Sequence, residues 1–177
     1  MMGDVIKLSE LSADQMPEKL RPDYYFDFVA HDFAHAPLVA EAKSVIEVLG
    51  RIGGYARLWL TGKIDQMRNS DSVTVLTESD FPGRGTGQFR AVIAEGAVFE
   101  PSYCVGSAPG QTPGTICLDR GARWLGAVAY LNEGDIYIGA ESLVEPGVGI
   151  KGPTIAMEGN EIRQGAYLRG NVILGSN

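Results

Sequence analysis

Four side chains near the C-terminal end of the sequence have types that suit an anionic ligand: Lys151, Arg163, Tyr167 and Arg169. A guanidinium group is planar and permanently charged, so it matches a pair of phosphate oxygens. Arg163 and Arg169 are six positions apart, which places them at equivalent points of a six-residue repeat. Charged side chains also line solvated surfaces and subunit contacts, and the sequence leaves these interpretations open beside a ligand site.

Histidine is the natural general base near neutral pH and a common metal ligand, but the sequence contains only His31 and His35. Their spacing is that of a zinc-binding pair on a helix. No third ligand or glutamate base accompanies them, and Pro37 indicates that a helix only begins there. We therefore expect capping or packing roles for both histidines, predict no metal site and leave the catalytic residue unassigned.

Residues 83–87 read Gly-Arg-Gly-Thr-Gly and have the form of a glycine-rich phosphate loop. A phosphate-binding loop of that kind needs a buried strand before it, a helix after it and a large α/β domain around it. The sequence offers none of these, so this segment is predicted to be a flexible entry loop to the elements that follow.

The elements that position the four candidate side chains follow a six-residue period. One apolar series comprises Ile138, Val144, Ile150, Ala156, Ile162, Leu168 and Leu174. A second series follows four positions later and is mostly small or β-branched: Ser142, Val148, Thr154, Asn160, Ala166 and Val172. A helix would need a period of 3.6 and a strand a period of 2, and neither fits. A period of six is typical of a parallel β-helix built from hexapeptide repeats, each a short strand and a turn.

Interrupted hexads extend this pattern towards the N-terminus, with a loop expected at residues 107–114. The residues predicted to point inward are, coil by coil, 93/99/105, 118/124/130, 138/144/150 and 156/162/168, with Leu174 opening a fifth coil. The predicted fold is therefore mainly β, a parallel β-helix of about four to five coils that is expected to end within the repeat. Free edges of such a coil are expected to need a cover.

An irregular arm and one amphipathic helix are predicted ahead of the repeat. The apolar residues at positions 38, 42, 45, 46, 49 and 52 have helical spacing, with Pro37 at the start and Gly50 and Gly53 near the end. We predict two regions: an N-terminal arm and capping helix at residues 1–65, and the β-helix at residues 66–177.

Charge and composition restrict the partners. The formal net charge is −7 and the isoelectric point about 4.8, which argues against a nucleic-acid partner. The sequence begins without an apolar run, so no membrane segment is predicted and a cytoplasmic location is expected. Cys104 and Cys117 lack metal-ligand spacing and are predicted to be free buried thiols.

Residues 144–175 resemble the left-handed β-helix domain of bifunctional sugar-1-phosphate nucleotidyltransferase/glucosamine-1-phosphate N-acetyltransferases. The match is carried by EPG at residues 145–147, KGP at residues 151–153 and EIRQGAYLRGNV at residues 161–172. The resemblance implies a left-handed coil, which is an exception to the usual right-handed crossover, and a homotrimer.

Members of that family bind acetyl-CoA between subunits and transfer its acetyl group to the amine of a hexosamine phosphate. The resemblance places Arg169 where the family has an arginine that contacts the sugar phosphate, with Arg163, Tyr167 and Lys151 as further substrate-binding candidates. The family's general base is a histidine on a later coil, which this sequence lacks. The function expected from the resemblance is a sugar-phosphate acyltransferase of the acetyl-CoA-dependent type. The alternative is a non-catalytic trimeric scaffold or sugar-phosphate-binding module.

Overall fold

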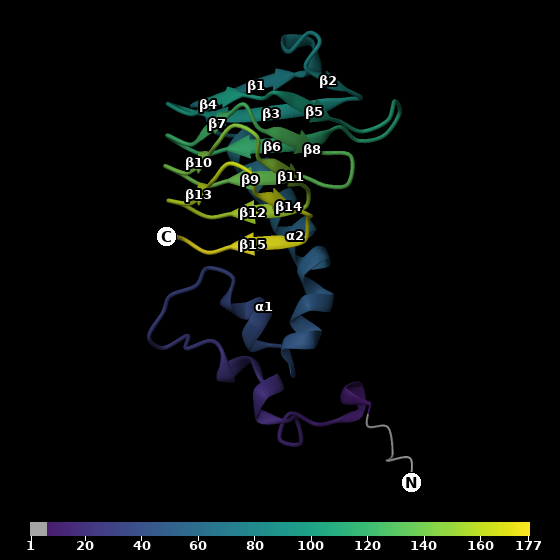
Figure 1. Ribbon diagram of the computed structural model, residues 1–177, viewed down its shortest axis with the longest axis vertical. Coiled ribbons are helices and arrows are strands. Elements are labelled where there is room, and N and C mark those ends of the chain that lie inside the picture. Colours follow the sequence, from purple (N-terminus) through teal and green to yellow (C-terminus); the bar gives the residue numbers. More distant parts are fainter. Residues whose placement is uncertain (1–6) are drawn as a thin grey trace. The chain divides into compact units, whose positions relative to one another are not determined.

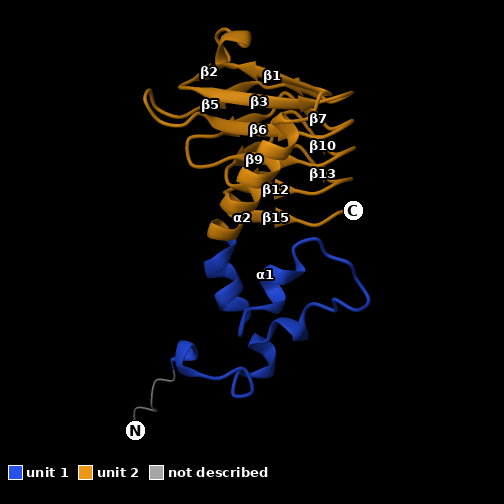
Figure 2. Ribbon diagram, turned by 180° about the vertical axis from the view of Figure 1, so that it is seen from behind, with its two compact units in different colours: residues 1–52 blue, residues 53–177 orange. Residues whose placement is uncertain are grey.

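The structure, a computed structural model, describes residues 7–177 and contains strands β1–β15, helices α1 and α2 and four short 3-10 helices in that range. Contacts group the chain into two compact units, residues 1–52 and residues 53–177, which are described separately here (Figure 2). The division predicted after residue 65 falls within helix α2 (Val45–Arg68) and stays a prediction. Within residues 7–177, no helix combines the length and the apolar character needed to cross a bilayer.

Three sheets make up most of the larger unit, and from β3 onward the chain visits them in turn (Figure 1). Sheet 1 contains β1 (Val73–Thr77), β3 (Phe89–Ala94), β6 (Gly114–Leu118), β9 (Ile136–Ile138), β12 (Thr154–Ala156) and β15 (Val172–Leu174), in that order. Sheet 2 contains β4 (Val98–Glu100), β7 (Arg123–Leu125), β10 (Leu143–Val144) and β13 (Glu161–Ile162). Sheet 3 contains β2 (Gly85–Thr86), β5 (Tyr103–Val105), β8 (Val128–Tyr130), β11 (Gly149–Lys151) and β14 (Tyr167–Leu168).

The named strands pair in parallel, except that β1 is antiparallel to β3. The mainly β, parallel part of the predicted fold is therefore confirmed. Residues 69–72 separate α2 from β1.

The six-residue period is visible in the register of sheets 1 and 2. In sheet 1 the aligned residues are Ile93, Leu118, Ile138, Ala156 and Leu174. In sheet 2 they are Phe99, Trp124, Val144 and Ile162. All of these side chains belong to one hydrophobic core, and Trp124 is fully buried within it. The predicted inward positions in these two sheets are therefore correct.

The register of sheet 3 corrects two predicted inward residues. Cys104 and Ala129, not Val105 and Tyr130, align with Ile150 and Leu168 and face the core. From the inward residue of sheet 2 to the inward residue of sheet 3, the chain thus advances five positions in the first two coils and six in the later ones. The physical reason is side-chain volume, because the large rings of Phe99 and Trp124 are each followed inward by a small residue.

Helix α2 runs through the glycines that were predicted to end it. Within the larger unit its residues Ala56, Leu60, Ile64 and Met67 pack against the outer side of sheet 1. The facing residues are Val92, Cys117, Tyr137 and Ile155, which alternate with the inward residues of the same strands. Burial of this apolar stripe outweighs the low helix propensity of glycine, which is about 1 kcal/mol per residue. The helix residues of this unit cover the flank of a sheet and do not cap its end, which corrects the predicted capping helix.

The first coil is covered instead by the segment that follows β1. A short 3-10 helix, η4 (Glu78–Asp80), is held by a hydrogen bond from the Thr77 amide to Asp80 Oδ2 of 2.7 Å. Immediately after it, the ring of Phe81 lies 6.0 Å from that of Phe89 and 5.3 Å from that of Phe99, measured between centroids. This aromatic cluster closes the apolar interior next to β3 and β4.

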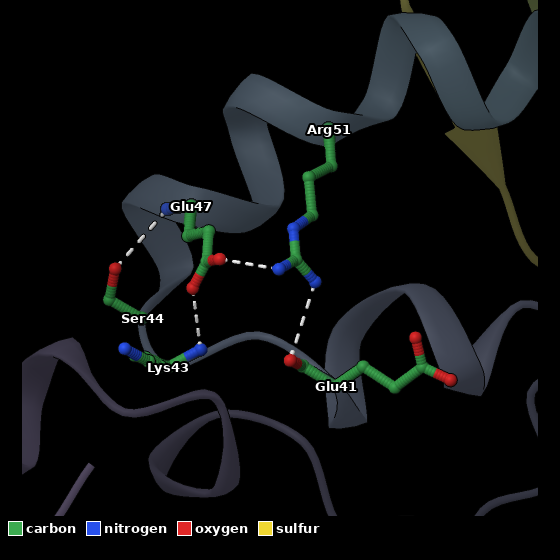
Figure 3. Close-up of polar contacts among 5 residues, drawn as sticks. All are labelled: Glu41, Lys43, Ser44, Glu47 and Arg51. Atoms are coloured by element: carbon green, nitrogen blue, oxygen red, sulfur yellow. Dashed lines mark hydrogen bonds and ion pairs between the residues drawn. The ribbon is translucent and has the colours of Figure 1, made fainter. Parts of the chain in front are cut away.

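The smaller unit contains three 3-10 helices, η1 (Leu8–Glu10), η2 (Glu18–Leu20) and η3 (Pro22–Tyr24), followed by α1 (Ala36–Ala40) and the first turns of α2. The predicted continuous helix from Pro37 is interrupted after Ala40, because α2 has its own cap (Figure 3). Ser44 Oγ accepts a hydrogen bond of 3.2 Å from the Glu47 amide, and Glu47 Oε2 accepts one of 2.7 Å from the Lys43 amide. Arg51 pairs with the other carboxylate oxygen of Glu47.

Candidate functional site

The candidate side chains Lys151 and Tyr167 belong to neighbouring strands of sheet 3. Gly149 aligns with Tyr167, and Lys151 follows Gly149 by two positions on the same face of β11. That face is opposite to Ile150, which is fully buried in the core. Lys151 and Tyr167 therefore lie on the outer side of sheet 3.

Arg169 continues this outer face just beyond the end of β14. The register that pairs Ile150 with Leu168 puts Arg169 beside Lys151. A Cβ at Gly170 would lie 2.8 Å from the carbonyl oxygen of Gly152 and 3.5 Å from that of Lys151, so the two chain segments stay in close contact there. The fold thus brings Lys151, Tyr167 and Arg169 together, although Lys151 and Arg169 are 18 positions apart.

The two cations of this group differ in their partners. Lys151 Nζ forms an ion pair with Glu133 Oε1, and the lysine side chain is 28% exposed. Arg169 is exposed, and within residues 7–177 no hydrogen bond or ion pair involves its guanidinium. This group therefore comprises one carboxylate and two cations, and its summed charge is positive in a chain whose formal net charge is −7.

Two tyrosine rings meet above Gly149 on the same face. The rings of Tyr130 and Tyr167 are 6.1 Å apart between centroids and nearly perpendicular, at 85°. Tyr130 aligns with Lys151, directly across from it on β8. Tyr130 was predicted to point inward and was therefore missed as a site residue, because the five-residue spacing after Trp124 has no marker in the apolar pattern.

Arg163 lies apart from the other candidates. It follows β13 in sheet 2, and its Nη2 donates a hydrogen bond of 2.8 Å to Glu161 Oε2. The hydrogen bond and charge of Glu161 raise the pKa of Arg163, whose side chain is 76% exposed. Arg163 follows a strand of sheet 2 and is bound by Glu161, so it does not belong to the Lys151–Arg169 group on sheet 3.

The two histidines belong to the smaller unit and the glycine-rich segment to the larger one. His35 is buried at the start of α1, with its ring 5.6 Å from that of Phe33, and burial lowers its pKa, whereas His31 is exposed. Across residues 7–177, no group of three or more His, Cys, Asp or Glu side chains is placed to hold a metal ion. In residues 83–87, β2 pairs with β5, and a Cβ at Gly87 would lie 2.5 Å from the Ser107 carbonyl oxygen.

The comparisons with known proteins add nothing to this geometry. No family model, curated protein or solved structure matches the chain.

A second polar cluster lies in a concavity of about 270 Å³ beside the C-terminal end of α2. Its lining includes Lys63, Ser70, Asp119 and Arg120. Lys63 Nζ lies 3.3 Å from Asp119 Oδ2, and Asp119 also accepts hydrogen bonds from the Arg120 amide and the Tyr137 hydroxyl. The charged groups of this cluster pair with one another and connect helix α2 to sheet 1. The cluster is therefore a weaker candidate for a ligand site than the Lys151–Arg169 face.

The chemistry available on the outer face of sheet 3 is recognition of an anion. Lys151 and Arg169 supply ammonium and guanidinium donors, and charge-assisted hydrogen bonds from such groups are about twice as strong as neutral ones. The phenols of Tyr130 and Tyr167 add ring faces and hydroxyl groups. A cationic edge beside aromatic rings suits a ligand that carries both a phosphate and a ring.

Proposed function

We propose that residues 89–174 form a left-handed parallel β-helix and that the protein is a sugar-phosphate-binding member of the acyltransferase type. The observation that carries this proposal is the adjacency of Lys151 and Arg169 beside Tyr167 on one outer face. The cyclic order of the three sheets and the six-residue register in sheets 1 and 2 support the coil. The left hand is inferred from the resemblance of residues 144–175.

The proposed ligand is a hexose or hexosamine phosphate. A phosphate monoester carries close to two negative charges at neutral pH. Arg169 would bind two phosphate oxygens through its planar fork, and Lys151, already oriented by Glu133, would contribute a single charged donor. The protein is acidic overall, so the two cations of this face reduce the repulsion that a dianion would meet.

Acetyl-CoA as the acyl donor and a homotrimer, both drawn from the resemblance, complete the proposal together with a cytoplasmic location. In a trimer, a second copy packed against the outer face of sheet 3 would give the ligand a second wall. No general base is assigned, since the only histidines of the sequence are His31 and His35.

A non-catalytic trimeric scaffold or sugar-phosphate-binding module is the second candidate. It is favoured by one specific observation, which is that both histidines precede the first strand of the sheets. In this version Lys151 and Arg169 retain the ligand and no acyl group is transferred.

Calorimetric titration with glucosamine-1-phosphate and a turnover assay with acetyl-CoA test both candidates. We expect the chain to bind the sugar phosphate and Arg169→Ala to lose most of that binding. Arg163→Ala is the matched control, because Arg163 has the same charge and the same position in the six-residue repeat as Arg169 but follows a strand of sheet 2. The Arg163→Ala variant should bind the sugar phosphate as tightly as the unaltered protein does. Absence of sugar-phosphate binding by the unaltered protein would reject the proposal, and acetyl transfer would reject the non-catalytic candidate. Light scattering tests the trimer, which a monomer would contradict.

A further inference from the structure

The outer face of sheet 3 has a feature that anion binding alone does not explain. Tyr167 is 54% exposed, although its ring packs edge-to-face with Tyr130. The two rings come from strands β8 and β14, which flank β11 on either side. They therefore form an L-shaped aromatic corner over the middle strand, open towards solvent on the same face as Lys151.

Gly149 is the floor of this corner. A Cβ at this position would lie 2.8 Å from Cδ2 and 3.2 Å from Cε2 of Tyr167, and 3.7 Å from Cε2 of Tyr130. The φ angle of Gly149 is not positive, so an ordinary residue could adopt its backbone conformation. Glycine within a strand is unfavourable and often marks a close approach of another group. Here it leaves room for the Tyr167 ring to lie across the strand.

Tyr167 and the two cations are spaced along the strand direction, whereas Tyr130 lies level with Lys151. Lys151 and Arg169 each follow the aligned Gly149–Tyr167 pair by two positions. Two residues of a strand span about 6.6–6.8 Å. A ring stacked in the corner would thus have its phosphate substituent within side-chain reach of both cations.

A pyranose fits this combination of groups. Its axial C–H bonds form an apolar face, and the negative face of an aromatic ring attracts such weakly positive hydrogens. The tyrosine hydroxyls remain able to donate to or accept from the hydroxyl groups of the sugar. An acyclic phosphate would satisfy the cations but would leave the aromatic corner exposed.

We propose that Tyr130 and Tyr167 form a stacking corner that selects a pyranose ring, whose attached phosphate is bound by Lys151 and Arg169. This inference rests on the proposed function, because it concerns the ligand of that same face. It adds the selection of a cyclic over an acyclic phosphate and assigns it to Tyr130, Tyr167 and Gly149.

Calorimetric titration of the full chain with glucosamine-1-phosphate and with glycerol-3-phosphate tests the inference. We expect Tyr167→Ala and Tyr130→Ala to weaken binding of the cyclic ligand by about fivefold to tenfold and to leave the acyclic ligand unaffected. Tyr103→Ala is the matched control, since Tyr103 is 37% exposed on the same sheet but lies on β5, outside the corner. Equal losses for both ligands, or no loss for either, would overturn the stacking corner while leaving phosphate binding in place.

Two further measurements separate ring stacking from a structural role of the rings, and the first of them uses only the unaltered protein. Saturation-transfer NMR on the unaltered protein should show transfer from tyrosine ring protons to the C–H protons of one pyranose face, and uniform or absent transfer would reject the corner. Light scattering on Tyr167→Ala should give the same mass as the unaltered protein, and a smaller mass would assign the rings to a subunit contact instead. If the unaltered protein binds neither phosphate, the proposed function fails together with this inference.

Discussion

The hydroxyl of Tyr137 donates a hydrogen bond of 2.6 Å to Asp119 Oδ2 between helix α2 and sheet 1. Lys63 approaches the same oxygen at 3.3 Å, and its ammonium lies 5.1 Å from the centre of the Tyr137 ring. Burial opposes ionisation of Asp119, but the hydrogen bonds from Tyr137 and the Arg120 amide and the charge of Lys63 outweigh it and lower the carboxyl pKa. Asp119 is therefore held as a carboxylate in the folded protein.

Removal of the Tyr137 hydroxyl should destabilise the protein in a pH-dependent way. We expect Tyr137→Phe to lower the free energy of unfolding by about 1–2 kcal/mol at pH 7, because the lost bond goes to a charged, partly exposed acceptor. A lowered folded-state pKa means that the contribution is complete above the unfolded pKa, near 3.8, and disappears as the pH falls through the folded value. Urea unfolding at pH 7 and at a pH below the folded-state pKa of Asp119 measures this, and a difference that stayed equally large in acid would contradict the mechanism. Tyr103→Phe, at an exposed tyrosine, is the control.

The pH dependence of stability expected from Asp135 is opposite to that expected from Asp119. Burial raises its pKa, while the hydrogen bond of 2.7 Å from the Thr115 amide to Oδ1 and the charge of Arg57 act against that rise. A raised folded-state pKa means that the ionised form costs stability at neutral pH, and stability is regained as the pH falls through the folded value.

We expect Asp135→Asn to be neutral or stabilising by up to about 1 kcal/mol at pH 7, because the amide keeps an acceptor for Thr115 without a buried charge. Asp135→Ala should cost about 1–3 kcal/mol, because the Thr115 amide loses its partner. Thermal unfolding of both variants measures this difference, and equal losses would show that the charge itself is needed.

The sequence predicted inward positions well where the apolar series was uninterrupted, as at Ile138, Val144 and Ile150. It failed at Tyr130, because Ala129 and Tyr130 are both apolar and the period alone permits either. The choice is made by volume in three dimensions, where the buried ring of Trp124 leaves space for an alanine at the next inward position.

The candidate site was predictable to a similar degree. Lys151 and Arg169 are 18 positions apart, which is three uninterrupted hexads, so their adjacency follows from the repeat. Tyr130 precedes the irregular residues 131–135, and the period of its own coil places it inward with Leu118 and Trp124, so the sequence spacing gives no sign of its outer position. The apolar pattern does not predict the separate start of α2, although Ser44 and Glu47 have the S-x-x-E spacing of a capping box.

The glycines of α2 should respond differently to alanine. A Cβ at Gly62 meets no atom within 4 Å, so Gly62→Ala should stabilise the protein by about 1 kcal/mol through helix propensity. A Cβ at Gly53 would lie 2.6 Å from Asn171 Oδ1, so Gly53→Ala should lack this gain or destabilise. Urea unfolding of the pair measures the contrast, and an equal gain in both variants would show that Asn171 moves aside freely.

The two cysteines should be inert in the folded protein. Both are free and buried, as predicted, and burial raises the pKa of each thiol to about 12. Because the thiolate is the reactive form, iodoacetamide at pH 8 should leave both cysteines unmodified under native conditions. Mass spectrometry should show two adducts once urea unfolds the chain. Rapid native labelling of Cys117, beneath α2, would indicate that the helix detaches from sheet 1.

The cap of α2 lies in the smaller unit, so its contribution is best measured locally. Ser44→Ala removes the acceptor of the Glu47 amide and should destabilise the first turn by about 1 kcal/mol. Hydrogen exchange at the amides of Glu47 and Val48 should then be about fivefold faster, while exchange in the strands of sheet 1 stays unchanged. Ser44→Asp is the matched control, since aspartate is an equally good cap and its charge suits the helix N-terminus. Unchanged exchange in Ser44→Ala would mean that Glu47, held by the Lys43 amide and Arg51, secures the turn alone.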